Sequence, residues 1–188
     1  MVHKLILASN SPRRKELLSG LGIPFEVRII PDIDESFPHD MPLSEIPCYI
    51  ARKKADAYRL SIKDNELIIT ADTVVILDGQ IIEKPLDRDD AIRMLHTLSG
   101  RTHEVITSVV MTTVEKQVEF SVHSTVDFAV LENEEIIYYV DSFQPFDKAG
   151  AYGIQEWIGY IGVQGIHGSF YNVMGLPVQR LYRELKKF

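Results

Sequence analysis

Two arginines and one aspartate are the residues of this 188-residue sequence best suited to chemistry on a charged ligand. Arg13 and Arg14 stand side by side after Ser11-Pro12, in the stretch ILASNSPRRKELL. Ser11 is a good helix N-cap and Pro12 suits the first helical position, so both arginines fall in the first turn of a predicted helix. Cations are disfavoured at this positive end of the helix dipole. Either the two side chains turn away into water, or an anion binds there.

An anion-binding pocket is the first interpretation of this stretch. It would combine free helix N–H groups, the hydroxyls of Ser9 and Ser11, and the two guanidinium groups. The alternative is a capped helix with two solvated arginines. Two adjacent arginines at a strand-to-helix corner favour the pocket. The stretch is not a Walker phosphate-binding loop, because the pattern G-x-x-x-x-G-K-[ST] does not occur in the sequence.

Asp72 interrupts a run of β-branched and apolar residues, IITADTVVIL. Aspartate is depleted in strands, and a buried carboxylate needs hydrogen-bond partners or a metal. Asp72 is therefore a candidate general base or metal ligand. The alternative is an aspartate that ends one strand and bonds a neighbouring loop. The strand pattern resumes directly after Asp72, which favours the functional interpretation.

Lys84 follows a predicted hairpin whose turn is Asp78-Gly79. In a two-residue hairpin Thr73 would face Lys84, and Lys84 would lie on the opposite face from Asp72. The two residues would then share a site only if a bulge, a strong twist or a strand end intervened. Local sequence alone favours an ordinary exposed lysine.

Three further features each have two interpretations. The acidic loop with Asp32, Asp34 and Glu35 either offers oxygen ligands to a magnesium ion or is simply solvated. Lys54 borders the apolar stripe of its helix, where it reaches a phosphate or extends into solvent. Gln155, in KAGAYGIQ, has an amide that suits reading a base edge, or it is a surface glutamine in a tight loop.

The order of the predicted elements indicates an α/β fold on a twisted mixed sheet, in one domain spanning 1–188. Strands are predicted at 4–8, 25–31, within 66–85, at 103–114, 117–131 and 160–164. Helices are predicted from Ser11 onward, at 43–60 with Ser44 as a possible N-cap, at 87–100, at 132–141, and after Pro177.

Composition limits the class of protein and ligand. The chain is 45% hydrophobic and 25% charged, which is typical of a globular protein, and no apolar stretch is long enough for a membrane span. The apolar amino terminus lacks a plausible signal-peptide cleavage site. A single cysteine, Cys48, favours a reducing compartment such as the cytoplasm. A net charge of -7 repels nucleic-acid polymers, so an anionic ligand is expected to be small.

Taken together, these motifs resemble those of the Maf family of nucleoside triphosphate pyrophosphatases. The matching motifs are ILASNSPRRKELL, Asp34-Glu35, ARKKADA, ITADTVV, EKP, LSGRTHEVITSV, DKAGAYGIQ and GSFYNVMGLPV. They occur in the family's order over nearly the whole chain. The resemblance implies an elongated Maf/ITPase-like α/β fold, two lobes with a cleft between them, and a homodimer. The implied reaction is hydrolysis of a nucleoside triphosphate to the monophosphate and pyrophosphate.

The resemblance also implies a role for each candidate residue. Asp72 would be the proton acceptor and, with Glu35, would hold a divalent cation, Mg²⁺ or Mn²⁺. The positions tied to substrate choice are Arg13, Thr73 and Gln155. The residues that would bind the triphosphate are Ser9, Arg14, Lys54 and Lys84. Similar family members often carry an acidic residue where this chain has Lys53, so the loop acids would have to supply the carboxylates.

The motifs GAYGIQ and NVMGLP resemble the branch that acts on dTTP and UTP more than the branch that acts on 7-methyl-GTP. CTP and modified pyrimidine nucleotides are further candidate substrates. One alternative is a nucleotide-binding regulator of cell division without turnover, because the family has been linked to arrest of septum formation. Another is a phosphatase that releases orthophosphate. Asp72 beside a phosphate clamp favours catalysis, and neither a nucleic-acid polymer nor a membrane is expected as a partner.

Overall fold

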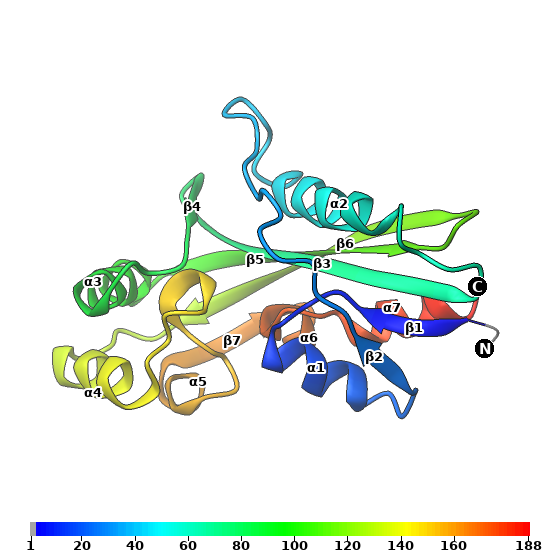
Figure 1. Ribbon diagram of the computed structural model, residues 1–188. Helices are drawn as coiled ribbons and strands as arrows, with labels where there is room; N and C mark the ends of the chain where they lie inside the picture. Colours follow the sequence, from blue (N-terminus) through cyan, green and yellow to red (C-terminus); the bar gives the residue numbers. More distant parts are fainter. Residues whose placement is uncertain (1–2) are drawn as a thin grey trace. The chain divides into compact units, whose positions relative to one another are not determined.

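A mixed sheet of seven strands organises the fold (Figure 1). The computed structural model describes residues 3–188. The strand order is β2-β1-β3-β5-β6-β7, with β4 paired to β3. The strands are β1 (Lys4–Leu7), β2 (Phe25–Val27), β3 (Glu66–Leu77), β4 (Gln80–Ile82), β5 (Thr102–Thr112), β6 (Gln117–Phe128) and β7 (Val163–His167). The α/β class with a mixed sheet is thereby confirmed.

Helices connect most of the strands. They are α1 (Pro12–Ser19), α2 (Ile46–Tyr58), α3 (Arg88–Leu98), α4 (Asn133–Phe143), the 3-10 turn η1 (Ala149–Ala151), α5 (Trp157–Gly162), α6 (Phe170–Met174) and α7 (Val178–Leu185). Within residues 3–188, no helix has the length and apolar character needed to cross a membrane.

The chain forms two compact units. Unit 1 comprises Met1–Thr73, Thr107–Val122 and Gly175–Phe188, and unit 2 comprises Val74–Ile106 and His123–Met174. The division falls within β3, β5 and β6, so each of these long strands contributes one part to each unit. The single domain over 1–188 and the cleft between two lobes stay predictions.

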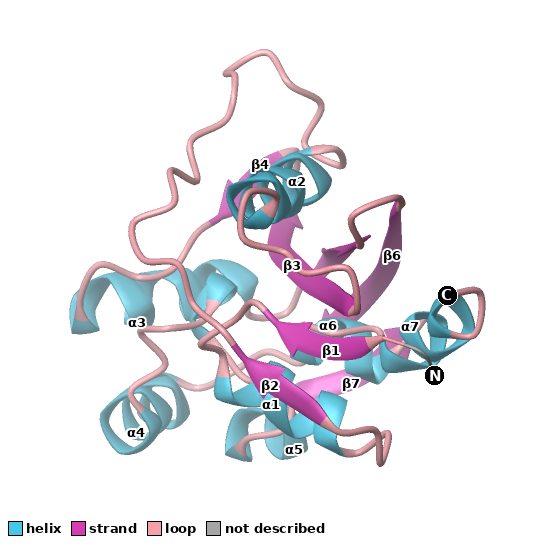
Figure 2. Ribbon diagram, turned by 45° about the vertical axis from the view of Figure 1, so that its right-hand side comes forward, coloured by secondary structure: helices cyan, strands magenta, loops and turns pink. Residues whose placement is uncertain are grey.

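In unit 1, β1 lies between β2 and β3 and is parallel to both (Figure 2). Leu5 pairs with Phe25 on one side and with Leu67 on the other. The side chains of Leu5, Ile6 and Leu7 are buried, as expected for a parallel strand with both faces covered. Ser9 follows the carboxyl end of β1, so residues after β1 reach the edge where parallel strands present ligand-binding groups.

Helix α2 lies beside β3 (Figure 2), and small residues of the helix make its contacts with the sheet. Ala51 and Ala55 form a buried cluster with Val110 of β5. The Thr70 hydroxyl of β3 donates to the Ala51 carbonyl at 2.7 Å. Alanines allow the helix to lie close to the strands, so Lys54, between them in sequence, is held near the middle of β3.

The β3–β4 hairpin confirms one prediction and corrects another. Leu77 pairs with Gln80, and Asp78 and Gly79 both have positive φ, 48° and 73°, as a two-residue hairpin turn requires. However, β4 ends at Ile82, so the predicted pairing of Thr73 with Lys84 is wrong. After Ile82 the chain leaves the hairpin, and the Glu83 carbonyl accepts from the Gly150 N–H at 3.0 Å.

Several predicted boundaries need correction. The strand predicted at 25–31 ends already at Val27. Helix α2 has Glu45 as its N-cap rather than Ser44, because a turn closed by the Glu45 N–H and the Pro42 carbonyl precedes it. The strand predicted at 160–164 begins only at Val163, after helix α5. A cap at Ser11, a cap at Asp87 and an unbroken β3 through Asp72 are confirmed.

An ion pair between half-buried Arg28 and buried Glu66, which the sequence analysis did not identify, fixes the start of β3. Glu66 is 1% exposed and accepts from two guanidinium nitrogens of Arg28, at 2.8 and 2.5 Å. The Tyr58 hydroxyl donates to the Arg28 carbonyl at 2.8 Å, which links this pair to α2. The bond from Arg28 lowers the pKa of Glu66 to about 2.

We predict that Glu66→Gln lowers the free energy of unfolding by about 1–3 kcal/mol at pH 7, because a charged hydrogen bond is lost in a buried place. The ordinary pKa of this carboxyl is 4.5 and its folded value is lower, so its contribution is complete above about pH 4.5 and is lost as the pH falls toward 2. Urea unfolding should show a smaller difference in free energy of unfolding between the variant and the unmodified protein at pH 3 than at pH 7. Glu26→Gln, at an exposed pair with Lys4, is the control. An equal difference at both pH values would contradict the prediction.

Candidate active site

The Arg14 guanidinium connects three segments of unit 1. Its Nε donates to the Gly175 carbonyl at 2.9 Å, and its Nη1 donates to the Ala71 carbonyl at 2.8 Å. Its Nη2 donates to the Thr73 hydroxyl at 3.1 Å. Ala71 and Thr73 flank Asp72, so Arg14 holds the backbone of β3 on both sides of the candidate base.

These contacts answer the question raised by a cation in the first helical turn. The Arg14 side chain does not extend into water. Two protein carbonyls and one hydroxyl accept hydrogen bonds from it, so its position does not depend on a bound anion. Burial lowers its pKa, and the charge of Asp72 opposes that shift. Arginine stays charged in any case, and five N–H groups leave it two donors for a ligand. Arg13 is half-buried, and its positive charge also lowers the pKa of Arg14.

The hydroxyls of Ser9 and Ser11 shape the turn between β1 and α1. Ser9 Oγ accepts from the Ser11 N–H at 3.2 Å, and Ser11 Oγ accepts from the Arg14 N–H at 3.4 Å. Ser9 is buried. Both residues therefore position the first turn of α1, and the triphosphate-binding role of Ser9 stays a prediction.

Asp72, Lys54 and Glu35 form a compact charged group in unit 1. The Lys54 Nζ lies 2.9 Å from Asp72 Oδ1 and 3.1 Å from Glu35 Oε1. The side chains of Asp72 and Lys54 are 13% and 14% exposed, whereas that of Glu35 is 52% exposed. The structure thus brings together the three residues on which the resemblance places proton transfer, phosphate binding and metal binding.

Lys53 holds the acidic loop against α2. Its Nζ lies 2.7 Å from Asp34 Oδ2 and 3.0 Å from the Ser36 carbonyl. The hydrogen bond from Lys53 lowers the pKa of Asp34 well below its usual range. Asp34 is therefore engaged by Lys53, while Glu35 points to Lys54. Consecutive lysines of one helix thus each hold one acid of the loop.

The carboxylates of Glu35 and Asp72 both contact the Lys54 ammonium group, so the two acids lie close enough to share one positive charge. Magnesium commonly takes one or two protein carboxylates together with substrate phosphates, so this pair fits a hard divalent cation. Among residues 3–188, no group of three or more histidine, cysteine or acidic residues forms a larger metal-binding cluster. Glu35 and Asp72 are thus a pair, rather than a larger cluster, of carboxylates around one cationic atom.

Lys84 and Gln155 belong to unit 2. Lys84 is exposed, as local sequence favoured. Gln155 is half-buried, and its Oε1 is buried without a hydrogen-bond partner among the described residues. A buried acceptor without a donor costs about 1–3 kcal/mol, so Gln155 is a candidate for a bond to a ligand or a water molecule.

Thr107 and Gly175 are residues of the site that the sequence analysis did not single out. Thr107 Oγ1 lies 2.9 Å from Thr73 Oγ1, and the Gly175 carbonyl accepts from Arg14. Thr107 is a polar residue within a buried apolar strand, EVITSVVMT, which is the same signal that drew attention to Asp72. No sequence signal identifies the Gly175 carbonyl, since every residue carries one.

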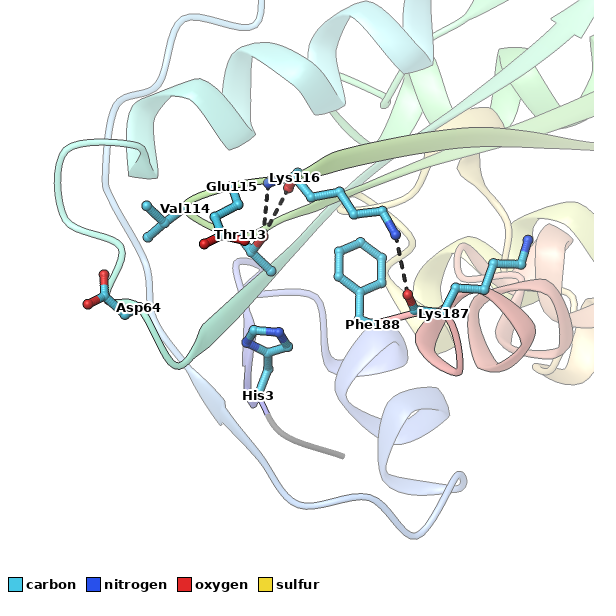
Figure 3. A pocket seen from close by; sticks show the side chains of 8 residues that line it. All are labelled: His3, Asp64, Thr113, Val114, Glu115, Lys116, Lys187 and Phe188. Atoms are coloured by element: carbon cyan, nitrogen blue, oxygen red, sulfur yellow. Dashed lines mark hydrogen bonds between the residues drawn. The ribbon is translucent and has the colours of Figure 1, made fainter.

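The pocket drawn in Figure 3 lies elsewhere in unit 1 and has a volume of about 290 Å³. None of the predicted site residues lines it. Its lining residues are His3, Asp64, Thr113, Val114, Glu115, Lys116, Lys187 and Phe188. His3 precedes β1, so the pocket lies at the amino end of that strand, whereas Ser9 and α1 follow the carboxyl end. The Lys116 Nζ donates to the Lys187 carbonyl at 3.3 Å and lies over the Phe188 ring. The positive charge in this pocket therefore already has protein partners.

Comparison with known proteins identifies the family. Residues 4–188 match the model of a protein family described as "Maf-like protein". The chain belongs to the Maf family. A Bacteroides thetaiotaomicron relative named dTTP/UTP pyrophosphatase is 61% identical over 185 residues, which is 98% of this chain and 96% of the relative. A Porphyromonas gingivalis relative of the same name is 57% identical over 188 residues, 99% of this chain and 94% of the relative.

The fold of this Maf-family chain also occurs among solved structures. A Ham1 protein from Staphylococcus aureus superimposes with a TM-score of 0.55 at 17% identity, covering 98% of each chain. This likeness confirms the predicted ITPase-like fold class. At that identity it concerns the fold alone.

We predict that Arg14→Lys lowers the free energy of unfolding by about 2 kcal/mol, because a lysine keeps the charge but cannot form the three-way fork. The buried carbonyls of Ala71 and Gly175 would then compete for one ammonium group. Urea unfolding measures the loss. Arg59→Lys is the matched control, since Arg59 is an exposed residue at the C-cap of α2 and its side chain pairs with Asp56 in the contacts described. Equal free energies of unfolding for the two variants would show that the three hydrogen bonds of Arg14 do not stabilise the fold.

Proposed function

We propose that this Maf-family protein hydrolyses dTTP and UTP to the monophosphate and pyrophosphate. The observation that carries the proposal is the group of Asp72, Lys54 and Glu35 with the Arg14 guanidinium beside it. Relatives named dTTP/UTP pyrophosphatase, 57–61% identical over nearly the full chain, support the substrate class. CTP and modified pyrimidine nucleotides are further candidates.

The reaction requires attack by water on the α-phosphorus and departure of pyrophosphate. Asp72 is the proton acceptor: it takes a proton from the attacking water as the new P–O bond forms. The bond from the α-phosphorus to the bridging oxygen breaks, and its electron pair leaves with pyrophosphate. Lys54 and the remaining donors of Arg14 stabilise the negative charge on the phosphate oxygens, which is the main catalytic requirement of phosphoryl transfer.

Glu35 and Asp72 are the residues that would hold a divalent cation, Mg²⁺ or Mn²⁺. Its charge would stabilise the anionic oxygens of the substrate and leaving group. Lys54, which bridges the two carboxylates in this structure, would then be free to bind a phosphate. Lys53 supports this arrangement by holding the acidic loop to α2.

The role of Gln155 in substrate choice is supported by the unpartnered Oε1 atom. A uracil or thymine base carries an N–H donor at N3 and a carbonyl at C4, which match the oxygen and nitrogen of one amide. The roles of Ser9, Arg13, Thr73 and Lys84 in substrate binding rest on the family resemblance. So does a homodimer, while a cytoplasmic location is supported by the single cysteine.

A nucleotide-binding regulator without turnover is the alternative. A carboxylate such as Asp72 repels phosphate oxygens, so it would weaken binding in a protein that only binds. The relatives cited above carry enzyme names, which gives the alternative no support.

We predict that the protein, incubated with a panel of nucleoside triphosphates and Mg²⁺ or Mn²⁺, releases pyrophosphate fastest from dTTP and UTP. Pyrophosphate and orthophosphate are measured separately, and a parallel reaction contains EDTA. Pyrophosphate with monophosphate supports the proposal, and loss of turnover in EDTA supports the cation. Orthophosphate with diphosphate would show attack on the γ-phosphorus instead. Tight binding without any product would favour the regulator.

We predict that Asp72→Asn reduces kcat by at least about 100-fold, because the proton acceptor is lost. The fold should persist, since asparagine keeps the shape and Lys54 retains Glu35 as a charged partner. Circular dichroism and pyrophosphate release are measured together. Asp56→Asn, at an exposed position of α2, should leave turnover unchanged. Normal turnover by a folded Asp72→Asn protein would remove Asp72 from the mechanism.

A further inference from the structure

Thr107 is a buried hydroxyl that the mechanism does not use. It lies on β5 between Ile106 and Ser108 and is 0% exposed. Its Oγ1 is 2.9 Å from Thr73 Oγ1. Burying a hydroxyl in an apolar strand is unfavourable unless the hydroxyl is hydrogen-bonded, so the contact with Thr73 explains why a polar residue is tolerated here.

Thr73 links this hydroxyl to Arg14. The Thr73 oxygen accepts from Arg14 Nη2 at 3.1 Å and shares a hydrogen bond with Thr107. A hydroxyl has one proton and two acceptor positions, so two fixed neighbours set the direction of its hydrogen bonds. Thr107 therefore fixes the Thr73 hydroxyl in the place where Arg14 binds it.

Arg14 transmits this placement to Asp72. It also donates to the Ala71 carbonyl at 2.8 Å, so its two nitrogens bind the residues directly before and after the base. Lys54 holds the carboxylate of Asp72 itself at 2.9 Å. The base is thus fixed at its side chain by Lys54 and at its backbone by Arg14. A misplacement of a reacting group by about 1 Å can slow a reaction by about 100-fold, so smaller displacements also matter.

We propose that Thr107 is a positioning residue for the reaction, acting through Thr73 and Arg14 on the placement of Asp72. This inference rests on the proposed function. Thr107 lies on β5, the strand next to β3 in the sheet, and is fully buried, so its role does not require contact with the substrate. Its loss is expected to reduce kcat more than it changes KM, since the affected interaction concerns the reacting groups.

The test compares three variants of the full chain by pyrophosphate release from dTTP. Thr107→Val keeps the shape of the side chain and removes the hydroxyl, whereas Thr107→Ser keeps the hydroxyl. Thr112→Val is the matched control: Thr112 lies on the same strand, is 1% exposed, and accepts a hydrogen bond from Gln117 at 3.0 Å. Both valine variants lose a buried hydroxyl that forms a hydrogen bond, but only Thr107 is linked to Arg14.

We expect Thr107→Val to lower kcat by about tenfold with KM within about twofold of the unmodified protein. Thr107→Ser should restore kcat, and Thr112→Val should leave it unchanged even where thermal unfolding shows a similar loss of stability. Equal kcat values for Thr107→Val and Thr112→Val would overturn the inference. If Thr107→Val does not fold, the comparison uses Thr107→Ser and Thr107→Cys, which differ only in oxygen against sulfur. Equal kcat values for these two variants would also overturn the inference.

The two proposals fail in different ways. If the unmodified protein releases no pyrophosphate from any nucleotide, the proposed function is wrong. If the unmodified protein is active and Thr107→Val is as active, the function stands and only the positioning role of Thr107 is wrong.

Discussion

The site of unit 1 depends on one guanidinium group. The side chain of Arg14, a residue of α1, binds the middle of β3 through Ala71 and Thr73 and the segment before α7 through Gly175. A cation in the first turn of a helix is unfavourable on its own. The carbonyls and the hydroxyl that it binds compensate for that position, and they make the helix, the strand and the carboxyl-terminal segment one structural unit around Asp72.

The charges around Asp72 are balanced before any ligand binds. Lys54 lies between Glu35 and Asp72, and Lys53 engages Asp34. This balance lets acidic and basic groups coexist in a partly buried place without a strongly unfavourable net charge. A ligand that brings both phosphates and a cation would exchange partners with these groups, the phosphates taking the lysine and the cation taking the carboxylates. The site is therefore suited to an anion that arrives with a metal ion.

Local sequence signals were reliable where one residue type has a specific physical meaning. Ser11 and Asp87 as caps, Asp78-Gly79 as a hairpin turn, and Asp72 inside a continuous strand are confirmed. The pairing of Thr73 with Lys84 was wrong because strand length depends on tertiary partners, here the carbonyl of Glu83 bound by Gly150. The destination of Arg14 was not predictable, since its carbonyl acceptors leave no mark in a sequence. Proximity of Glu35, Lys54 and Asp72 could be anticipated only from the family resemblance.

The bond between Arg14 and the Gly175 carbonyl joins residues 161 positions apart. During synthesis on a ribosome, the amino-terminal helix is made early, but this acceptor emerges only when almost all of the chain has been translated. The arrangement around Asp72 is therefore completed late in folding, because long-range contacts of this kind can close only after both partners are present. An incomplete chain that stops before residue 175 would carry Arg14 and Asp72 without the bond that holds their segments to the carboxyl-terminal region.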